Sequence, residues 1–513
     1  MRHIDRAAAD IGLTTNILMG NAGRAVADAM LDSLGDLRDR HVLVLVGPGN
    51  NGGDGLVAAV HLHDAGAVVT LYIWIRKVEG DANFATTQQA HISAIFADQD
   101  PNCDVLRQSV ARADVIVDAL LGTGKARAIT GFLKSILETV GSFKRPEAKV
   151  VAVDLPTGMD ADTGAVDEVT PRADLTVTLA FPKLGLFFFP GASYVGKLVV
   201  GDIGLPPEPE GVASTEVITP TLVRRDLPAR PLDSHKGTFG RVLVVAGSVS
   251  YVGAPALACA AAGRVGAGLV SLACPRTIYP ILATKLTEAI CSPLPDVEPG
   301  ALGTDSLEPL VSTMPNFDVV LLGPGLGQHP QTVSFVDQLL KWVSGQRQVT
   351  LSSRPWVVDA DGLNVLANIP NWWQRLPRQS ILTPHPAELS RLLRVGVGDI
   401  QKDRLGSARR AATTWGRIVV LKGAFTIVAS PEGQIFINPS ANPALATAGT
   451  GDVLAGAIAG LLGQGMPPLS AAIAGVCLHS LAGEIVRDEI GEAGALAGDL
   501  LPALPRALRR VRT

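Results

Sequence analysis

The chain has 513 residues and a formal net charge of -4 at pH 7, and 47% of its residues are hydrophobic, 18% charged and 4% aromatic. This length predicts about two to four domains, the charge balance excludes a basic nucleic-acid-binding surface, and the composition excludes long disordered regions. The 54 glycines and the few aromatic residues are typical of α/β proteins, in which glycine turns join buried Val- and Leu-rich strands.

The N-terminal segment MRHIDRAAAD carries charges where an exported protein has an apolar signal sequence. The five cysteines are scattered without a C-x-x-C pair, which favours free thiols in a reducing compartment. The apolar run VLAGAIAGLLG after Asp452 is shorter than the about 18 residues that a membrane-spanning helix needs. We therefore expect a cytoplasmic protein with no membrane partner.

Strand-like runs alternate with helix-like segments in the first part of the chain, which predicts βαβ units and a parallel sheet. The strand-like runs occupy residues 41–46, 68–75, 114–121, 149–156 and 175–180. The periodicity weakens over residues 204–237, where prolines cluster with charged, Thr and Ser residues as in a linker. We expect a first domain at residues 1–205 and a linker at residues 206–231.

The alternation restarts after the linker and predicts a second, independent α/β domain at residues 232–513. Its strand-like runs occupy residues 241–248, 269–275, 318–325, 355–362, 380–386 and 417–430. An Ala-rich, helix-like segment follows the first of these runs. The expected fold class is therefore α/β in both halves.

A glycine-rich turn follows the first strand-like run, in the segment GPGNNGGDGLVAAVHL. Gly47, Gly49 and Gly52 have the G-x-G-x-x-G spacing of a dinucleotide-binding turn, in which backbone N–H groups and a positive helix end face phosphate. A redox Rossmann site also needs an acidic residue at the end of the second strand, where this chain has Arg76 and Lys77. The incomplete pattern argues against a redox cofactor and favours a phosphate-binding turn, with a purely structural turn as the alternative.

Two further strand-like runs end in acidic residues, Asp118 and Asp154. The carboxyl ends of strands converge on one crevice in a doubly wound sheet, so these residues and Asn51 are expected to meet there. Amide and carboxylate oxygens together with the Thr157 hydroxyl suit a hard cation, although each Asp by itself could instead cap a helix or a turn. The segment GTGK at residues 122–125 lacks features of a Walker A phosphate loop, and we reject that interpretation.

The first half contains five motifs in a fixed order: LMGNAGRAVA, GPGNNGGDGLVAAVHL, DALLGTG, VDLPTGMDADTG and ADLTVTLAFPKLGL. With these motifs, nearly all of residues 1–205 resembles the NAD(P)H-hydrate epimerase family. The resemblance implies a Rossmann-like three-layer αβα sandwich that binds K+ through Asn51, Asp118 and Thr157, where the family usually has Ser in place of Thr157. It also implies that the hydrated nucleotide contacts Asn50, Asn51, Gly52, Gly53, Asp54, Gly122, Thr123, Gly124, Lys125, Ala126, Arg127, Ala128 and Asp154.

The second half contains a glycine turn before an apolar helix, in NPALATAGTGDVLAGAIAGLL. The turn places Gly449, Gly451 and Asp452 at the predicted start of the helix, where backbone N–H groups could form an anion hole. Asp452 would lie within reach of a hydroxyl group that it could deprotonate. This arrangement suits phosphoryl transfer, and the alternative is an Asp that only caps the helix.

Further motifs of the second half are GRVLVVAGSVSYVGAPALA, LLGPGLG, VVDADGLN, TPHPAE and VVLKGAFTIV. Over residues 235–505 they are similar to the ribokinase-like superfamily and, more closely, to the NAD(P)H-hydrate dehydratase family, which commonly has Gly in place of Ala387. The resemblance implies a ribokinase-like α/β domain. The implied substrate contacts are Ala254, Gly325, Gly327, His385 and Asp452. The implied nucleotide contacts are Lys422, Gly423, Ala424, Phe425, Thr426 and Gly451.

Together, the two resemblances imply a bifunctional enzyme that repairs hydrated NADH and NADPH. The first domain would interconvert the two epimers, with Asp154 as general acid or base and Asp118 as the alternative. The second would phosphorylate the S epimer transiently at its hydroxyl, with Asp452 as the base and with ADP and Mg2+ bound, and would then release phosphate. ADP is favoured over ATP because a two-domain fusion resembles bacterial members. We also expect a homo-oligomer.

Two alternative functions remain open. The first is a kinase of a small hydroxylated metabolite, because the turn AGTGD is shared across ribokinase-like enzymes. The second is an N-terminal half that binds a nucleotide or a partner without catalysis, so that only the second domain is an enzyme.

Overall fold

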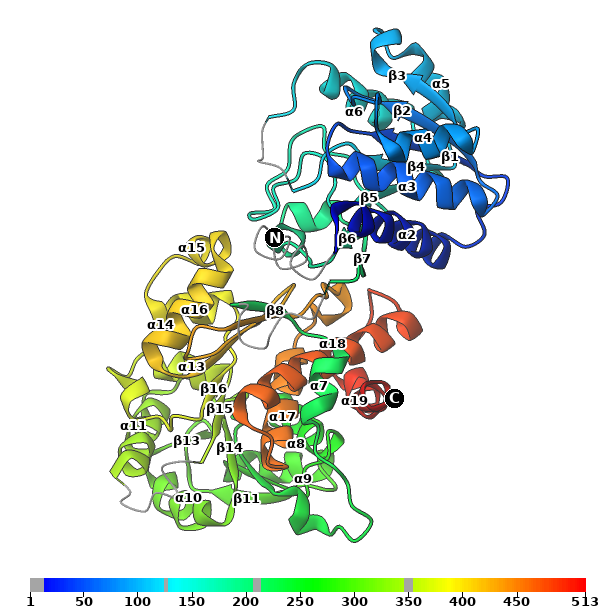
Figure 1. Ribbon diagram of the computed structural model, residues 1–513. Coiled ribbons are helices and arrows are strands. Elements are labelled where there is room, and N and C mark those ends of the chain that lie inside the picture. The colour runs from blue at the N-terminus through cyan, green and yellow to red at the C-terminus, as the bar shows by residue number, and fades with distance from the viewer. Residues whose placement is uncertain (1–12, 124–127, 206–213, 346–353) are drawn as a thin grey trace. The chain divides into compact units, whose positions relative to one another are not determined.

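The structure, a computed structural model, describes residues 13–123, 128–205, 214–345 and 354–513 (Figure 1). The chain forms two compact units, Met1–Glu208 and Pro209–Thr513. Each unit contains its own large sheet and its own hydrophobic core. The two units are therefore described one at a time.

The first unit is built on a seven-stranded sheet in the order β3-β2-β1-β4-β5-β6-β7, in which every neighbouring pair is parallel. The strands are β1 (His41–Val46), β2 (Val68–Ile73), β3 (Ser93–Phe96), β4 (Val115–Ala119), β5 (Lys149–Val153), β6 (Leu175–Leu179) and β7 (Lys197–Gly201). All five strands predicted here are present, because inner strands of a parallel sheet are covered on both faces and read as apolar runs. The edge strands β3 and β7 are absent from the prediction, since half-exposed residues dilute their apolar pattern.

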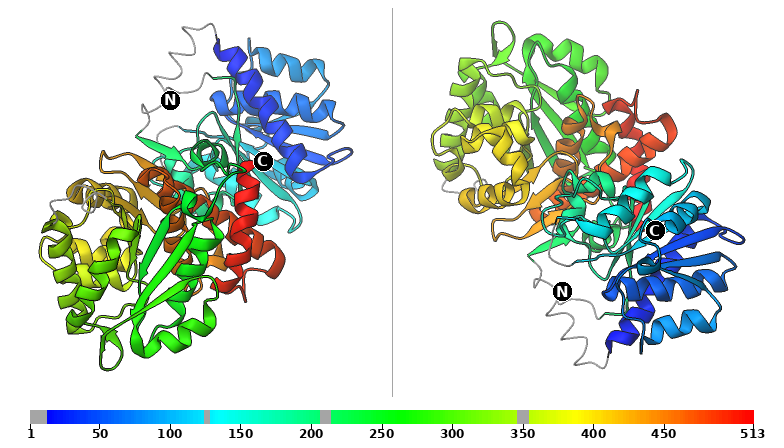
Figure 2. Two further views of the ribbon diagram at one scale, coloured as in Figure 1. Left: turned by 90° about the horizontal axis from the view of Figure 1, so that it is seen from below. Right: turned by 90° about the horizontal axis from the view of Figure 1, so that it is seen from above.

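Helices cover both faces of this sheet and produce three layers (Figure 2). α2 (Thr15–Leu34), α3 (Asn50–Asp64) and α4 (Ala82–Gln89) pack against the face that holds the even-numbered side chains of β1. α5 (Asp104–Arg112) and α6 (Gly131–Phe143) pack against the odd-numbered side chains. The two sets separate because successive side chains of a strand point to opposite faces.

The strand order of the first sheet reverses between β1 and β4. In open α/β sheets such a reversal leaves a crevice at the carboxyl ends of the strands. The glycine turn after β1 and the loops after β4 and β5 all begin at this edge. The fold therefore brings together the three segments in which the sequence places its candidate residues.

The second unit is built on a ten-stranded sheet in the order β11-β10-β9-β14-β15-β16-β17-β18-β19-β8. The run from β11 to β17 is parallel, whereas β18 is antiparallel to both of its neighbours. The strands are β8 (Thr215–Val217), β9 (Arg241–Val245), β10 (Leu269–Pro275), β11 (Ile290–Leu294), β14 (Val319–Leu322), β15 (Trp356–Val358), β16 (Ile381–Leu382), β17 (Ile418–Leu421), β18 (Ile427–Ala429) and β19 (Ile435–Ile437). A separate antiparallel pair consists of β12 (Asp296–Val297) and β13 (Ala301–Leu302).

Helices again lie on both sides of this sheet (Figure 1). One side carries α7 (Pro220–Asp226), α8 (Gly253–Arg264), α9 (Tyr279–Lys285), α17 (Thr450–Gly463), α18 (Pro468–Ile490) and α19 (Ala497–Arg512). The other side carries α10 (Leu307–Thr313), α11 (Pro330–Gly345), α13 (Asp361–Leu366), α14 (Pro386–Leu393), α15 (Val397–Lys402) and α16 (Arg404–Trp415).

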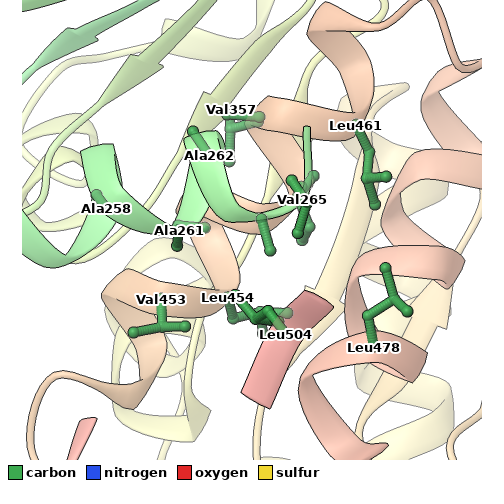
Figure 3. Packing of buried hydrophobic residues seen from close by; sticks show 14 of the residues in the cluster. Ala258, Ala261, Ala262, Val265, Val357, Val453, Leu454, Leu461, Leu478 and Leu504 are labelled. Atoms are coloured by element: carbon green, nitrogen blue, oxygen red, sulfur yellow. The ribbon is translucent and has the colours of Figure 1, made fainter. Parts of the chain in front are cut away.

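The core of the second unit centres on the packing of α8 against α17 (Figure 3). A Cβ atom on Gly456 of α17 would overlap the carbonyl oxygen of Ala258 in α8. One turn further, a Cβ atom on Gly460 would lie 2.5 Å from the carbonyl oxygen of Ala262. Glycine at these two positions lets the helix backbones touch, and this contact sets where α17 begins relative to the sheet.

Residues 214–226, within the segment expected as a linker, contribute to the second unit. β8 extends the second sheet as a parallel neighbour of β19, and α7 packs against α18 and α19. The three-residue strand is too short to show a periodic pattern, and prolines surround it. Residues 206–213 of the expected linker lie outside the described residues.

One helix among the described residues, α18, is long and apolar enough to cross a membrane by length and composition alone. In its most apolar window, 72% of the residues are buried within the unit, where the helix packs against α17 and α19. The sequence analysis considers only the shorter apolar run that becomes α17. Burial inside the fold accounts for the composition of α18, since a helix that is apolar all round is a core helix or a membrane span.

Candidate functional sites

A cavity of about 1130 Å³ opens at the carboxyl edge of the first sheet. The start of α2, the glycine turn and the loops after β4, β5 and β6 line it. Of the predicted substrate contacts, the cavity wall includes Asn50, Asn51, Asp54, Gly122, Thr123, Ala128 and Asp154. Gly52 and Gly53 are not part of the wall, and Gly124, Lys125, Ala126 and Arg127 lie outside the described residues. The volume is slightly larger than the about 300–1,000 Å³ that is usual for small-molecule sites and is adequate for a nucleotide.

The glycine turn touches its neighbours through backbone atoms. A Cβ atom on Gly47 would overlap the carbonyl group of Leu120, and one on Gly52 would overlap the carbonyl oxygen of Gly47. Helix α3 then begins at Asn50 without a side-chain cap. Its first N–H groups, which have no partner within the helix, can therefore bind an anion.

Arg76 braces this turn from the end of β2. Its Nη1 atom donates hydrogen bonds to the carbonyl oxygens of Gly49 (2.8 Å) and Gly47 (3.2 Å), and its Nε atom donates to Asp81 (2.7 Å). In the sequence, Arg76 stands where a redox Rossmann site has its ribose-binding acid. In the structure, its guanidinium group instead holds the glycine turn.

Asp118 and Thr157 form a buried pair behind the cavity wall. The Thr157 hydroxyl donates to Asp118 Oδ1 (2.7 Å) and the Thr157 N–H to Asp118 Oδ2 (2.8 Å). Burial raises the pKa of Asp118, partly offset by these hydrogen bonds, and no ion pair to Asp118 occurs among the described residues. The Asn51 side chain faces Gly122 in the adjoining loop, and its Nδ2 atom is buried without a partner.

These oxygen donors are compatible with a cation of low charge. One carboxylate, one amide and one hydroxyl are hard ligands, and a cation near Asp118 would compensate a buried negative charge. In the part of the chain that the structure describes, no group of three His, Cys, Asp or Glu side chains could hold a metal ion. A set with a single carboxylate therefore suits the singly charged K+ better than a divalent cation, which is usually held by several carboxylates.

Asp154 and Lys183 form a buried ion pair in the cavity wall. Asp154 has a left-handed backbone (φ 69°), and each of the two residues is 8% exposed. Asp154 Oδ1 accepts hydrogen bonds from Lys183 Nζ, from the Leu179 N–H (3.2 Å) and from the Thr178 hydroxyl (3.3 Å). No role is predicted for Lys183 from the sequence, although a lysine among the apolar residues of ADLTVTLAFPKLGL is a usable signal.

Asp54 is the second carboxyl group in the cavity wall and is 7% exposed. Burial raises its pKa well above the usual range, and the Asp154 carboxylate adds to the rise. Arg76 and Lys183 act in the opposite direction without cancelling the shift. Asp118, in contrast, does not line the cavity.

The second candidate site lies at the carboxyl edge of the second sheet. Gly325 follows β14 with φ 63°, and a Cβ atom on it would lie 3.2 Å from Ala254 Cβ. The Ser248 hydroxyl donates to the Gly325 carbonyl oxygen (2.8 Å), and the Gly327 N–H donates to Asp361 Oδ2 (3.0 Å). The structure thus brings together the three predicted substrate contacts at residues 254, 325 and 327.

A buried charge cluster occupies the ends of β15, β16 and β17. Lys422 Nζ lies 2.5 Å from Asp359 Oδ1 and 3.8 Å from Glu388 Oε2. Burial opposes the charged form of Lys422, but Asp359 and Glu388 outweigh it and raise the lysine pKa. Burial also raises the pKa of Glu388 to about 7. The sequence analysis quotes the motifs that contain Asp359 and Glu388 without assigning either residue.

Asp452 lies in the first turn of α17, beside this cluster. Burial, followed by the Asp359 carboxylate, raises the pKa of Asp452 to about 7. A Cβ atom on Gly451 would lie 3.2 Å from Lys422 Nζ, so the predicted catalytic turn and the predicted nucleotide lysine are neighbours. Gly449, the residue before the helix, has φ 92° and no side chain to cap it.

His385 is the N-cap of α14. Its Nδ1 atom accepts hydrogen bonds from the N–H groups of Ala387 (3.1 Å) and Glu388 (3.3 Å). Burial, then the charge of Lys422, lowers the pKa of His385. The histidine is therefore neutral at pH 7 and lies next to the charge cluster through Glu388.

The predicted nucleotide turn, residues 422–426, joins β17 to β18. Arg404 Nη2 donates to the carbonyl oxygens of Lys422 (3.3 Å) and Ala424 (3.4 Å). The Thr426 hydroxyl donates to the Gly423 carbonyl oxygen (2.8 Å). Phe425 has φ 53°, which places this turn in a conformation that needs tertiary support. The sequence analysis does not find Arg404, whose guanidinium group provides that support.

Two family models match this chain. One, described as NAD(P)H-hydrate dehydratase, matches residues 242–506. The other, described as YjeF-related protein N-terminus, matches residues 15–185. The two matches fall in the two structural units.

Full-length relatives cover the whole chain. The protein from Moorella thermoacetica is 41% identical over 100% of this chain and 96% of its own length. The protein from Thermofilum pendens is 37% identical over 99% of this chain and 95% of its own length. The protein from Escherichia coli is 36% identical over 99% of this chain and 92% of its own length. All three are named bifunctional NAD(P)H-hydrate repair enzyme Nnr.

A solved structure matches the second unit. It is an ADP/ATP-dependent NAD(P)H-hydrate dehydratase from Bacillus subtilis, co-crystallised with ATP and Mg2+. It is 31% identical, covers 58% of this chain and 98% of its own, and has a TM-score of 0.48. The resemblances stated for the two halves of the sequence are confirmed by the family models and the full-length relatives. The expected fold class of two α/β domains is confirmed by the two sheets and the helices that cover them.

The glycine turn generates a test of the backbone contact. Gly52→Ala is expected to destabilise the first unit by about 1–3 kcal/mol, the usual cost of an overpacked site, because its Cβ would overlap Gly47. Gly49→Ala is the matched control, since a Cβ there meets no atom within 4 Å. Calorimetric unfolding of the full chain measures both variants, and equal stability of the two would contradict the contact.

Proposed function

Because this chain belongs to the family of bifunctional NAD(P)H-hydrate repair enzymes, we propose that its two units catalyse successive steps in the repair of hydrated NADH and NADPH. The first unit interconverts the R and S epimers of the hydrate. The second unit converts the S epimer back to NADH or NADPH at the expense of ADP. The single observation that carries the proposal is identity above one third with bifunctional relatives over essentially the full chain.

In the hydrate, the hydroxyl group is bound to C6 of the ring, next to the ring nitrogen N1. The lone pair of N1 can expel the hydroxyl with the help of a proton, and addition of water then scrambles the configuration at C6. The cavity of the first unit suits this step, because the start of α3 can hold the pyrophosphate. Of the two candidate acids, Asp154 is supported by its place in the cavity wall, where Asp118 is absent.

Asn51, Asp118 and Thr157 would hold K+ in the first unit. The ion would supply positive charge beside the buried Asp118 carboxylate, whose described partners are neutral donors, the Thr157 hydroxyl and the N–H groups of Thr157 and Leu120. It would thereby tie the start of α3 to the loops after β4 and β5. These three segments carry most of the cavity wall.

The second step needs phosphorylation, because hydroxide is a poor leaving group. Asp452 takes the proton of the C6 hydroxyl group. The hydroxyl oxygen then attacks the terminal phosphorus of ADP, and AMP leaves. The N–H groups of the turn at residues 449–451 bind the transferred group, and Lys422 neutralises its charge. Phosphate then leaves C6 with the bonding electrons, and loss of a proton from C5 restores the ring double bond.

Mg2+ would accompany the nucleotide in the second unit. Asp359 Oδ2 is buried without a partner and Glu388 lies beside it, across Lys422. Carboxylate oxygens are the ligands that Mg2+ accepts together with nucleotide phosphates. The two acidic residues would hold the ion and so fix the phosphates against Lys422 and the residue 422–426 turn.

The proposed function predicts a nucleotide-dependent recovery of reduced nicotinamide. The purified chain, given a mixture of both epimers, is expected to convert all of it with ADP and none without a nucleotide. Near-ultraviolet absorbance of reduced nicotinamide follows the reaction, with ATP in a parallel sample. Conversion that stops at the share of one epimer would remove the epimerase from the proposal, and a stable phosphorylated product would favour a metabolite kinase.

The pKa of Asp452 predicts the pH dependence of dehydration. A general base must be deprotonated, so kcat/KM is expected to fall as the pH drops below about 7 and to level off above it. Asp452→Asn is expected to reduce kcat by about 100- to 10,000-fold, the usual contribution of a general base, with epimerisation by the same chain unaffected. Glu388 also has a pKa of about 7 and is therefore tested separately. If the fall in kcat/KM below pH 7 disappears in Glu388→Gln, the pH dependence belongs to Glu388 and not to Asp452.

The K+ site predicts a cation-specific stabilisation of the first unit. KCl is expected to raise its melting temperature more than NaCl does at equal ionic strength, because bound K+ would increase the free energy of unfolding by about 2.7 kcal/mol at 100 times the dissociation constant. Thr157→Val removes one ligand and is expected to abolish the difference between the two salts. Thr176→Val, also a buried threonine, is the control that should retain it, and equal effects of K+ and Na+ on the unmodified chain would contradict the site.

A further inference from the structure

The cavity of the first unit contains two carboxyl groups in opposite electrostatic situations. Asp154 accepts three hydrogen bonds at one oxygen, one of them from the buried ammonium group of Lys183. Asp54 accepts no described hydrogen bond and forms no described ion pair, although it is equally buried. Both line the same cavity as Lys183.

The donors around Asp154 all point at one of its oxygens. Two hydrogen bonds and a cation directed at that oxygen hold the carboxyl group in place and complement a negative charge there. The lysine is itself fixed, because its Nζ also donates to the Leu179 carbonyl oxygen (3.0 Å) and the Thr178 hydroxyl (3.2 Å). Asp154 and Lys183 therefore form a rigid pair whose carboxylate faces the cavity.

The surroundings of Asp54 favour its neutral form. Burial disfavours the carboxylate, and Asp154 repels a second negative charge. The cations near Asp54 are Arg76 and Lys183, and each has closer partners. Arg76 bonds to Asp81 and to the glycine turn, and Lys183 bonds to Asp154.

We propose that these two carboxyl groups divide the epimerisation between them: Asp54 is the acid that protonates the leaving hydroxyl, and Asp154, paired with Lys183, is the anion that stabilises the ring cation. This inference rests on the proposed epimerase function and deepens it. It changes the role of Asp154 from general acid to electrostatic stabiliser. Asp54 changes from a substrate contact to a catalytic residue, and Lys183 becomes the positioning residue of Asp154.

The step balances without an additional reactant. The proton of Asp54 moves to the C6 hydroxyl, the C–O bond breaks, and water leaves with the bonding electrons. The N1 lone pair forms a C=N bond, and its positive charge lies in the field of the Asp154 carboxylate. Water then adds to the opposite face of C6, the C=N electrons return to N1, and the proton lost by the added water restores the acid form of Asp54.

The division of roles is a chemical requirement of this site. A proton donor at neutral pH must be neutral, whereas stabilisation of a ring cation needs a fixed negative charge. Pairs of carboxyl groups whose environments separate their protonation states in this way identify the acid and its partner. One buried lysine for two carboxyl groups produces that separation.

The test measures epimerisation and dehydration by the same full-length chain. Asp54→Asn keeps the size of the side chain and removes its acidity, and it is expected to lower kcat for epimerisation about 100-fold or more. Dehydration of the pure S epimer with ADP should not change. Asp64→Asn is the matched control, because Asp64 is exposed at the other end of α3, and spontaneous epimerisation is subtracted at each pH.

A pH profile distinguishes an acid at position 54 from a structural role. In the unmodified chain, kcat for epimerisation is expected to fall as the pH rises through the raised pKa of Asp54, since the acid form is lost there. Asp54→Glu should show the same fall in kcat at high pH, but centred at a different pH. If the pH of this fall is the same in Asp54→Glu as in the unmodified chain, the proposal is overturned, even if Asp54→Asn fails to fold.

Lys183 is tested by its effect on Asp154. Lys183→Met is expected to lower kcat for epimerisation while NADP+ binding is retained, because the cation that holds the Asp154 carboxylate is lost. Lys183→Arg should restore kcat, since it keeps the positive charge, and a role in packing alone would not predict that rescue. Binding of NADP+ as a probe, measured by calorimetry, checks that the cavity is intact in each variant.

The outcomes separate this inference from the proposed function. An unmodified chain that fails to interconvert the epimers contradicts the epimerase function itself. An active chain whose Asp54→Asn variant binds NADP+ and retains full epimerisation contradicts only the role of Asp54. Loss of epimerisation with binding and dehydration intact is the result that the proposal expects.

Discussion

Both units depend on backbone segments that touch at the carboxyl ends of their sheets. In the first unit, Gly47 lies against the Leu120 carbonyl group and Gly52 against the Gly47 carbonyl oxygen, with no room for a side-chain carbon. In the second unit, Gly323 lies in the same way against the Asp359 carbonyl oxygen. These contacts place the first turn of a helix or the end of a strand at the site, so the glycines control where the charged side chains lie.

The two sites share an electrostatic design in which buried carboxyl groups outnumber the buried lysine beside them. Lys183 pairs with Asp154 and leaves Asp54 with a raised pKa. Lys422 pairs most closely with Asp359 and leaves Asp452 with a pKa of about 7. A single cation in a site of low dielectric stabilises the carboxylate that it touches most closely, and the remaining acid is poised to exchange a proton. Each unit therefore produces a reactive carboxyl group from the same imbalance of charge.

Much of the fold could be predicted from the chain, and the exceptions have physical causes. The run HVLVLV becomes β1 as expected, because a strand buried on both faces must be apolar throughout. The edge strand β7 and the short strand β8 are not found, since partial exposure or three-residue length removes the pattern. Among site residues, those inside recognisable turns are found. Arg76, Lys183 and Arg404 are not, because the parts of the site that they contact, at Gly49, Asp154 and Ala424, lie 27, 29 and 20 residues away in the sequence.

By itself, the sequence determined the two α/β halves, the glycine turns and the family to which each half belongs, since these depend on local spacing and on apolar periodicity. Only the tertiary structure decided which carboxyl groups face a cavity and which cation accompanies each of them. Protonation of a buried acid depends on its burial and on charges a few ångströms away. Those neighbours come from separate strand ends, and only folding brings them together.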